Sequence, residues 1–456
     1  MKKLITKTSV ILLLGMQLAC APEFLDIKPN KALVVPSQLA HYQALLDAAT
    51  VAMNQGPGLQ VLAGDEFYHP ESNINNLNFI ERNSYLWAER IFEGKGALDW
   101  EYPYKAIFNA NIAIDGLSKI KRDAANQKEW DQIYGSALFY RAFSVYSLAD
   151  VFAAPYRQTT AGDLPGIPYR TEMDVNQITG RGTLQQTYEK IINDLVQADE
   201  LLDDPMRYVH RPSGVAVKAA LARIYLSMGQ YDQAQKMATA ALAIQGTLLD
   251  YNALNPASAR QFPSPFAGTN YEIIFHYNLS GYSLVSSPLT GVDTLLYRSY
   301  HKDDLRKSYF FVQRPSGAFG FKGSYSGGAG LYGGLVTDEL YLIRAECYAR
   351  KQQVDLALTD LNLLLSARFK KDTFVPLTAT SETILELVLT ERKKELLARG
   401  LRWSDLRRLN QDPRFAITLR RTVKGVEYEL PPNNNRYVFP IPDDEIPLSG
   451  IEQNPR

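Results

Sequence analysis

The chain has 456 residues, of which 46% are hydrophobic and 21% are charged, which is typical of globular proteins and excludes disordered or collagen-like chains. At about 150 residues per domain, this length corresponds to two or three domains or to one large one. The 49 basic and 49 acidic residues balance, which argues against a general electrostatic attraction to nucleic acid. Two cysteines are too few for a disulfide scaffold or a cysteine-rich metal site.

The beginning of the chain has the pattern of a secretory signal. Three lysines precede an apolar run over residues 10–16, which is shorter than the about 20 residues that a membrane span needs. The sequence QLAC at 17–20 resembles a bacterial lipobox, although Gln17 stands where an aliphatic residue is usual. We therefore predict a lipoprotein signal peptide over residues 1–19 and lipidation of Cys20. A plain secretory signal with an incidental cysteine is the alternative.

Apolar residues recur with helical periodicity through most of the remaining chain. The helices predicted from this pattern cover residues 37–53, 98–120, 128–151, 182–203, 214–245, 334–367, 382–399 and 402–410. Thr183 is a favourable N-cap for the fourth helix, and Gly400 is a favourable end for the seventh. Between residues 246 and 333, short strand-like runs alternate with clusters of Pro, Ser and Gly. The sequence thus predicts a mainly α-helical fold with a loop-rich, minor β insertion.

This change of pattern divides the chain. After the signal peptide, we expect an N-terminal helical part over 20–245, the insertion over 246–333, and a C-terminal helical part with a tail over 334–456. The insertion is the candidate ligand region, because aromatic residues recur throughout it.

The N-terminal helical part ends in a repeat of the tetratricopeptide type. Its residues are Leu221, Ala222, Tyr225, Gly229, Tyr231, Ala234 and Ala241. Ala345, Tyr348 and Ala357 repeat part of this spacing without the glycine, and two unrelated amphipathic hairpins are the alternative for this second copy. Because such a hairpin buries its apolar face only against neighbours, we expect four helix pairs stacked together.

Short motifs from one end of the chain to the other resemble those of a single family. They are CAPEFLDIKP at 20–29, WEYPYKAIFNAN at 100–111, FYRAF at 139–143, RPSG at 211–214, DDLR at 303–306, ERKKELLARGLRWSDLRR at 391–408, and VFPIPDDEI at 438–446 with QNP at 453–455. Each motif alone is weak, but in this order they are similar to the RagB/SusD family of outer-membrane nutrient-uptake lipoproteins. Lys394 and Arg399 depart from the family pattern, in which Arg and an acidic residue are usual.

Catalytic and cofactor motifs are few. The five histidines form no HxxxH or HxH pair, so the sequence gives no support for a zinc site. Residues 328–333 match GxGxxG but follow Ser and Gly instead of a buried strand, which disfavours nucleotide binding. Glu391 and Glu395 could form a glycosidase pair, but interleaved cations favour an ion-paired helix corner packed on Trp403. We therefore predict no catalysis, no cofactor and no metal.

The family resemblance implies a tetratricopeptide-like, α-superhelical fold and a non-catalytic, surface-exposed binding protein. Such proteins are held in the outer membrane by their lipid and deliver a nutrient to a SusC-like TonB-dependent transporter. The resemblance therefore implies this transporter as a partner and an oligosaccharide or polysaccharide as the ligand, with no role for nucleic acid. A peptide ligand, as in RagB-like subunits, and a lipid-anchored glycoside hydrolase are the alternatives.

A sugar site needs an aromatic platform with a polar rim. Two regions have this composition, the segment 67–87 and the insertion. From these regions we select as candidate ligand contacts Tyr68, Trp87, Tyr282, Tyr325 and Tyr332. Core packing is the alternative for each of them.

Overall fold

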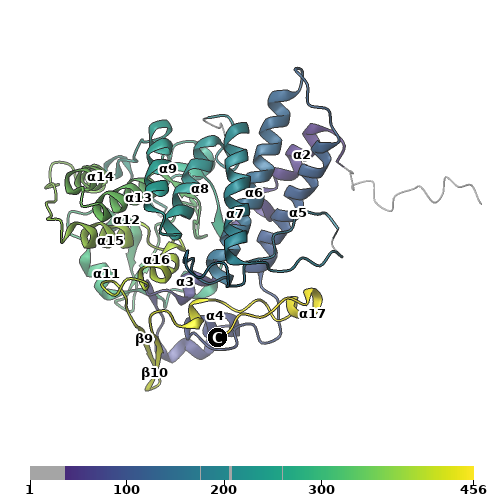
Figure 1. Cartoon of the computed structure of the whole chain (residues 1–456). Helices are drawn as coiled ribbons and strands as arrows, with labels where there is room; N and C mark the ends of the chain where they lie inside the picture. Colours follow the sequence, from purple (N-terminus) through teal and green to yellow (C-terminus); the bar gives the residue numbers. More distant parts are fainter. Residues whose placement is uncertain (1–35, 175, 205–207, 259) are drawn as a thin grey trace, which may run out of the picture.

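The computed structural model describes residues 36–456 except 175, 205–207 and 259, so the predicted signal peptide and Cys20 lie outside the described residues. The fold is mainly α-helical, as predicted. Its largest helices form one array that crosses the molecule (Figure 1): α5 (Leu98–Ser118), α6 (Gln127–Phe152), α7 (Leu184–Leu201), α8 (Gly214–Ser227), α9 (Tyr231–Ile244), α13 (Thr337–Arg350), α14 (Val354–Ser366) and α15 (Ile384–Glu395). Consecutive helices of this array pack against each other, and the hairpins of the two repeats are α8–α9 and α13–α14.

Local sequence explains where α7 begins and where the two hairpins turn. The Thr183 hydroxyl and the Gln186 side chain form a capping box at the start of α7. Between α8 and α9, Gly229 adopts a left-handed conformation with φ +72°, which glycine takes without strain. Between α13 and α14, which form the second hairpin, Gln352 takes the same conformation at the matching position, with φ +59°. The second copy therefore makes the same turn without the glycine.

Shorter helices and strands connect and cover the array. The shorter helices are α2 (Leu39–Leu46), α3 (Leu59–Ala63), α4 (Phe79–Tyr85), α10 (Ser283–Ser286), α11 (Thr294–Ser299), α12 (Arg306–Phe310), α16 (Leu401–Leu409) and α17 (Glu445–Ser449). The strands form two-stranded sheets: β1 (Gln55–Gly56) with β4 (Asn278–Leu279), β2 (Phe67–Tyr68) with β5 (Gly291–Val292), β3 (Ile273–Phe275) with β8 (Leu335–Val336), β6 (Phe311–Gln313) with β7 (Phe319–Phe321), and β9 (Leu419–Val423) with β10 (Val426–Leu430). Only the β1–β4 pair is parallel among the strands described.

Three local predictions differ from the structure. The helix predicted over 382–399 ends at Glu395, and Gly400, with φ +74°, lies directly before α16 instead of ending α15. The helix predicted over 37–53 is interrupted after α2, and the chain continues as a separate π-helical turn, Ala49–Met53. One of the strand-like runs predicted in the insertion, at residues 309–312, begins as the end of α12 and becomes extended only from Phe311. At 37–53 and at 309–312, the apolar residues do not continue over enough positions for a helical or extended period to be read from the sequence.

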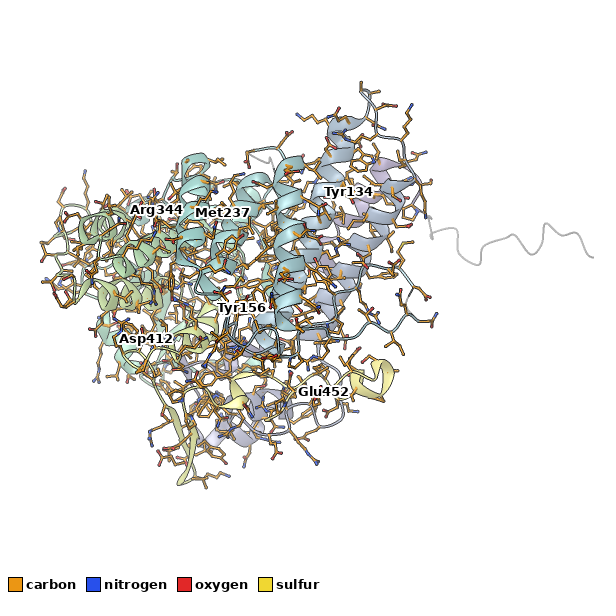
Figure 2. The ribbon with its side chains drawn as sticks, viewed as in Figure 1. Tyr134, Tyr156, Met237, Arg344, Asp412 and Glu452 are labelled. Atoms are coloured by element: carbon orange, nitrogen blue, oxygen red, sulfur yellow. The ribbon has the colours of Figure 1, made fainter. Side chains whose placement is uncertain are left out.

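The insertion shares the main hydrophobic core. The chain leaves the array after α9 and returns at α13, and these two helices pack directly on each other. From the segment between them, Phe275 of β3 packs its ring 4.9 Å from that of Phe139 and 5.8 Å from that of Phe143, both on α6. The insertion is therefore not an independent domain but a long excursion that folds back onto the helices (Figure 2).

A network of buried charges holds this excursion in place, and we call it the buried ion network. Its members are Glu272, Asp304, Arg306, Asp338, Arg368, Glu391, Lys394, Glu395 and Arg399. Glu395 on α15 accepts hydrogen bonds from Arg306 (2.9 Å) and Arg368 (2.8 Å). Burial would raise the pKa of Glu395, but Arg368, Arg306 and Arg399 outweigh it and hold that pKa at about 2. The carboxylate thus stays ionised inside the core.

In a second buried carboxylate, that of Glu66, the effect of burial outweighs the nearby cations, and the pKa is raised. Glu66 is buried and accepts one hydrogen bond at Oε1, from the backbone N–H of Ala398 (3.1 Å). Burial raises the pKa of Glu66 to about 7, the charge of Asp65 adds to the increase, and the Ala398 N–H, Arg402 and Lys393 oppose it. Arg402 and Lys393 instead bind Asp65, whose pKa they hold well below its usual range despite burial.

The raised pKa of Glu66 predicts that the free energy of unfolding depends on pH. Below its unfolded pKa of 4.5 the carboxyl is protonated in both states, so its contribution to stability is fully present. As the pH rises towards 7, the unfolded chain ionises first, and the free energy of unfolding falls by roughly 2–3 kcal/mol. Urea unfolding between pH 5 and pH 8 should show this decline in the wild type and not in Glu66→Gln.

The control for this experiment is Glu71→Gln, which changes an exposed glutamate and should follow the wild type. Equal pH profiles for the wild type and Glu66→Gln would show that Glu66 is ionised throughout, against the prediction.

Candidate functional site

The two aromatic-rich regions of the sequence lie against each other in the structure. β2 pairs with β5, which places Tyr68 opposite Gly291. Beyond this pair, the carboxylate of Glu81 on α4 accepts hydrogen bonds from the Ser283 hydroxyl (2.8 Å) and the Leu284 N–H (3.0 Å) at the start of α10. The segment 67–85 and the segment 282–292 are therefore fixed to each other, although about two hundred residues of chain separate them.

A pocket of about 580 Å³ opens next to these contacts, and we call it the α10 pocket. Its lining residues are Arg260, Gly281, Tyr282, Ser283, Val285, Ser286, Phe321, Lys322, Ser324, Gly328, Ala329, Gly330 and Leu331. They combine apolar and aromatic side chains with three serine hydroxyls and two cations, and no acidic residue is among the described lining residues. This combination suits a ligand with both apolar faces and hydroxyl groups.

The aromatic wall of the α10 pocket is held rigidly. Tyr282 is half-buried, and its phenol hydroxyl donates a hydrogen bond to Oδ2 of Asp99. The other oxygen of Asp99 accepts from the backbone N–H groups of Gly58 (2.6 Å) and Leu59 (3.0 Å). Burial raises the pKa of Asp99, while these hydrogen bonds lower it. Because the hydroxyl end is tied down, the Tyr282 ring keeps one orientation at the pocket.

A glycine-rich loop contributes Ser324, Gly328, Ala329, Gly330 and Leu331 to the lining of the pocket. The hydroxyls of Ser324 and Ser326 both donate to the carbonyl oxygen of Gly330, at 2.7 Å and 2.6 Å. Gly327 has φ +66°, and a Cβ there would lie 2.6 Å from the Cα of Ser264. The loop therefore needs glycine at this position, both for its backbone conformation and for the close approach of residue 264.

Two of the predicted ligand contacts are at the surface. Tyr68 is 36% exposed, and its ring lies over Gly291. Tyr282 lines the α10 pocket. Both remain candidates for ligand contact.

The other three predicted contacts are core residues, so the expectation of an exposed platform is corrected for them. The exposed fractions of Trp87, Tyr325 and Tyr332 are 2%, 2% and 1%. Their polar atoms are used inside the protein, where Trp87 donates to the Ala63 carbonyl, Tyr325 to Glu272, and Tyr332 to the Phe275 carbonyl. A buried ring with a satisfied polar end cannot offer its face to a sugar.

The sequence prediction missed several residues of the pocket. Phe321, Lys322 and Arg260 line it, together with the serines of α10. Phe321 was detectable only as one of many aromatic residues near the glycine-rich segment, and the cations and serines carried no distinctive spacing. Their convergence depends on the β6–β7 pair and on the loop at 260–268, which no local pattern predicts.

The glycosidase alternative gains no support from the carboxylates that suggested it. Glu391 and Glu395 are both buried and both bound by Arg306, and Lys394 also binds Glu391 at 2.6 Å. Trp403 is buried, and its ring packs against those of Tyr437 and Phe439, with centroids 4.8 Å and 5.9 Å away. Across the described part of the chain, no three His, Cys, Asp or Glu side chains are grouped as metal ligands. Nor does any helix within that part have the length and apolarity needed to cross a membrane.

Known proteins share both the sequence motifs and this fold. Residues 23–226 match the family described as starch-binding associating with outer membrane, and residues 338–456 match the SusD family. A SusD-like protein, P2, from Formosa agariphila is 30% identical over 141 residues, which cover 30% of this chain and 25% of that relative. The chain thus matches about a quarter of that relative's length.

Solved structures extend the similarity over nearly the whole chain. A SusD superfamily protein from Bacteroides thetaiotaomicron superposes with a TM-score of 0.73 at 21% identity, covering 92% of this chain and 100% of the other. A SusD-like carbohydrate binding protein from Bacteroides vulgatus gives a TM-score of 0.66 at 19% identity, covering 91% and 97%. The two family matches identify the chain as a member of the SusD family, and the solved structures show that it has the same fold.

Proposed function

We propose that this protein is a non-catalytic, lipid-anchored binding protein of the outer membrane, which takes an oligosaccharide into the α10 pocket and passes it to a SusC-like TonB-dependent transporter. The observation that carries the proposal is the α10 pocket itself, with a fixed tyrosine ring, a phenylalanine and a rim of hydroxyls and cations. Pyranose rings have apolar C–H faces that stack on aromatic rings and hydroxyls that need polar partners. The family description and the carbohydrate-binding relative point to the same class of ligand.

The lining of the pocket favours binding without hydrolysis. Glycoside hydrolysis usually needs two carboxyl groups about 5–10 Å apart on either side of the scissile bond. The described residues that line the α10 pocket include none. Binding and release is therefore the chemistry that this pocket suits.

The first test removes the two rings from the pocket. The double variant Tyr282→Ala, Phe321→Ala should bind its oligosaccharide at least about tenfold more weakly, because the stacking surface is lost. Isothermal titration with a panel of neutral oligosaccharides measures this, and we expect wild-type Kd values of about micromolar to millimolar. Since stacking does not depend on net charge, the Kd should change little with salt.

The matched control is Phe266→Ala, which removes an exposed phenylalanine that does not line the pocket. This variant should bind like the wild type. If wild-type protein binds acidic or neutral peptides and none of the oligosaccharides, the ligand class is wrong. If it releases reducing ends from the polymers, the proposal of a non-catalytic protein is wrong.

The second test concerns the anchor. Cys20→Ala removes the predicted acylation site, so the protein should leave the membrane fraction or stay unprocessed, because each buried acyl CH₂ contributes about 0.8 kcal/mol to anchoring. Cell fractionation and intact-mass analysis measure this. Cys347→Ala is the control, because that cysteine is buried within α13. Lipidation would be contradicted if the Cys20→Ala protein stayed in the membrane fraction and differed in mass from the wild type only by the substitution itself.

A further inference from the structure

Two cations line the α10 pocket without a carboxylate to neutralise them. Lys322, which directly follows β7, is half-buried, and its Nζ forms no hydrogen bond or ion pair with any described residue. Arg260 is exposed, and its guanidinium makes one hydrogen bond within the described chain, from Nη1 to the Gly327 carbonyl at 3.3 Å. Most of the donors of these two side chains are therefore free for a ligand in the pocket.

Partial burial already makes the charge of Lys322 less favourable. Burial lowers the pKa of Lys322, and no neighbouring carboxylate raises it. Arg306 in the same insertion is the opposite case, because burial would lower its pKa but three carboxylates of the buried ion network outweigh burial. An ammonium group that has lost part of its water without gaining a counter-charge is a position where an anion binds favourably.

The segment that carries Lys322 has no acidic residue of its own. Residues 305–337 include four basic side chains and no Asp or Glu. This range contains the part of the pocket lining from Phe321 to Leu331. No carboxylate of the same segment is therefore available to pair with Lys322.

Two carboxylates contact the α10 part of the lining, and both are already used. Glu81 is buried and accepts hydrogen bonds at the start of α10, and Asp99 is buried and accepts one from Tyr282. Neither residue lines the pocket, and neither forms an ion pair with Arg260 or Lys322. The two cations thus remain uncompensated among the described residues.

We propose that the α10 pocket selects an oligosaccharide that carries negative charge, either as uronate carboxylates or as sulfate esters. The rings of Tyr282 and Phe321 take the apolar face of a sugar, and the two cations bind the anionic group. Carboxylates and sulfate esters share the chemistry that Arg260 and Lys322 recognise, which is a set of charged oxygen acceptors. This inference rests on the proposed oligosaccharide binding and adds to it the class of ligand.

The test compares acidic oligosaccharides with neutral counterparts of the same backbone. Isothermal titration of the full-length mature protein uses a panel of oligouronates against their methyl esters, and a panel of sulfated galactan oligosaccharides against the same compounds after desulfation. We expect at least one acidic form to bind at least about fivefold more tightly than its neutral counterpart at low salt. This preference should decline in about 0.5 M salt, which screens the charges, while the neutral affinity changes little. The panel with the larger ratio identifies the anionic group.

A double variant assigns the preference to the two cations. Arg260→Gln, Lys322→Gln removes both charges and keeps side chains of similar length, so the ratio of acidic to neutral affinity should fall to about one. Arg298→Gln is the matched control, because it removes an exposed arginine of the same insertion that does not line the pocket. The control should keep the wild-type ratio. Thermal unfolding of each variant checks that the fold is intact.

The outcomes separate this inference from the proposed function. If neutral oligosaccharides bind and their acidic forms bind no more tightly, the inference is wrong and the proposed function stands. If no saccharide of any panel binds, the proposed function is wrong and the inference with it. A wild-type ratio in the double variant would show that Arg260 and Lys322 do not make the selection. Equally tight binding of a glutamate oligomer would show that charge alone is recognised, against selection of a saccharide.

Discussion

Buried pairing between arginines and carboxylates fixes the insertion onto the helix array, and the rest of the structure depends on it. Arg306 comes from the insertion, Glu395 from α15, and Arg368 from the turn after α14. Arg368 also binds Glu272 at 2.7 Å, immediately before β3. In water such pairs contribute little, but removing one partner of a buried pair leaves an uncompensated charge and costs about 3–5 kcal/mol. The network therefore defines one position of the insertion instead of merely adding stability.

This positioning matters because the α10 pocket is assembled from loops. Its lining residues are Arg260 and members of the segments 281–286 and 321–331, and none of the described lining residues belongs to the long helices of the array. Loops lose much conformational entropy on ordering, so a pocket made of them binds well only if the protein has already ordered them. The hydrogen bonds of Glu81 to α10 and of Tyr282 to Asp99 fix the residues that line the pocket in the same way.

The helical array could be predicted from the sequence, because period, caps and small residues are local signals. The ranges predicted for α5, α6 and α7 agree with the structure to within two residues at each end. The aromatic contacts could not be selected in the same way. In the insertion a buried ring such as that of Tyr325 and a pocket ring such as that of Tyr282 have the same local surroundings in sequence, and only tertiary packing separates them. The charged corner was predicted as ion-paired, but its main partners, Arg306 and Arg368, lie far from Glu395 in sequence.

Hydrogen exchange in Glu395→Gln tests most directly whether the network holds the insertion. This variant keeps the shape of the side chain and removes the charge that Arg306 and Arg368 share. We predict that amides of residues 272–331 exchange roughly 100-fold faster, while those of α5 and α6 keep their wild-type rates. Glu386→Gln, an exposed change on the same helix, should alter neither group. Equal acceleration throughout the chain, or none in the insertion, would contradict the account.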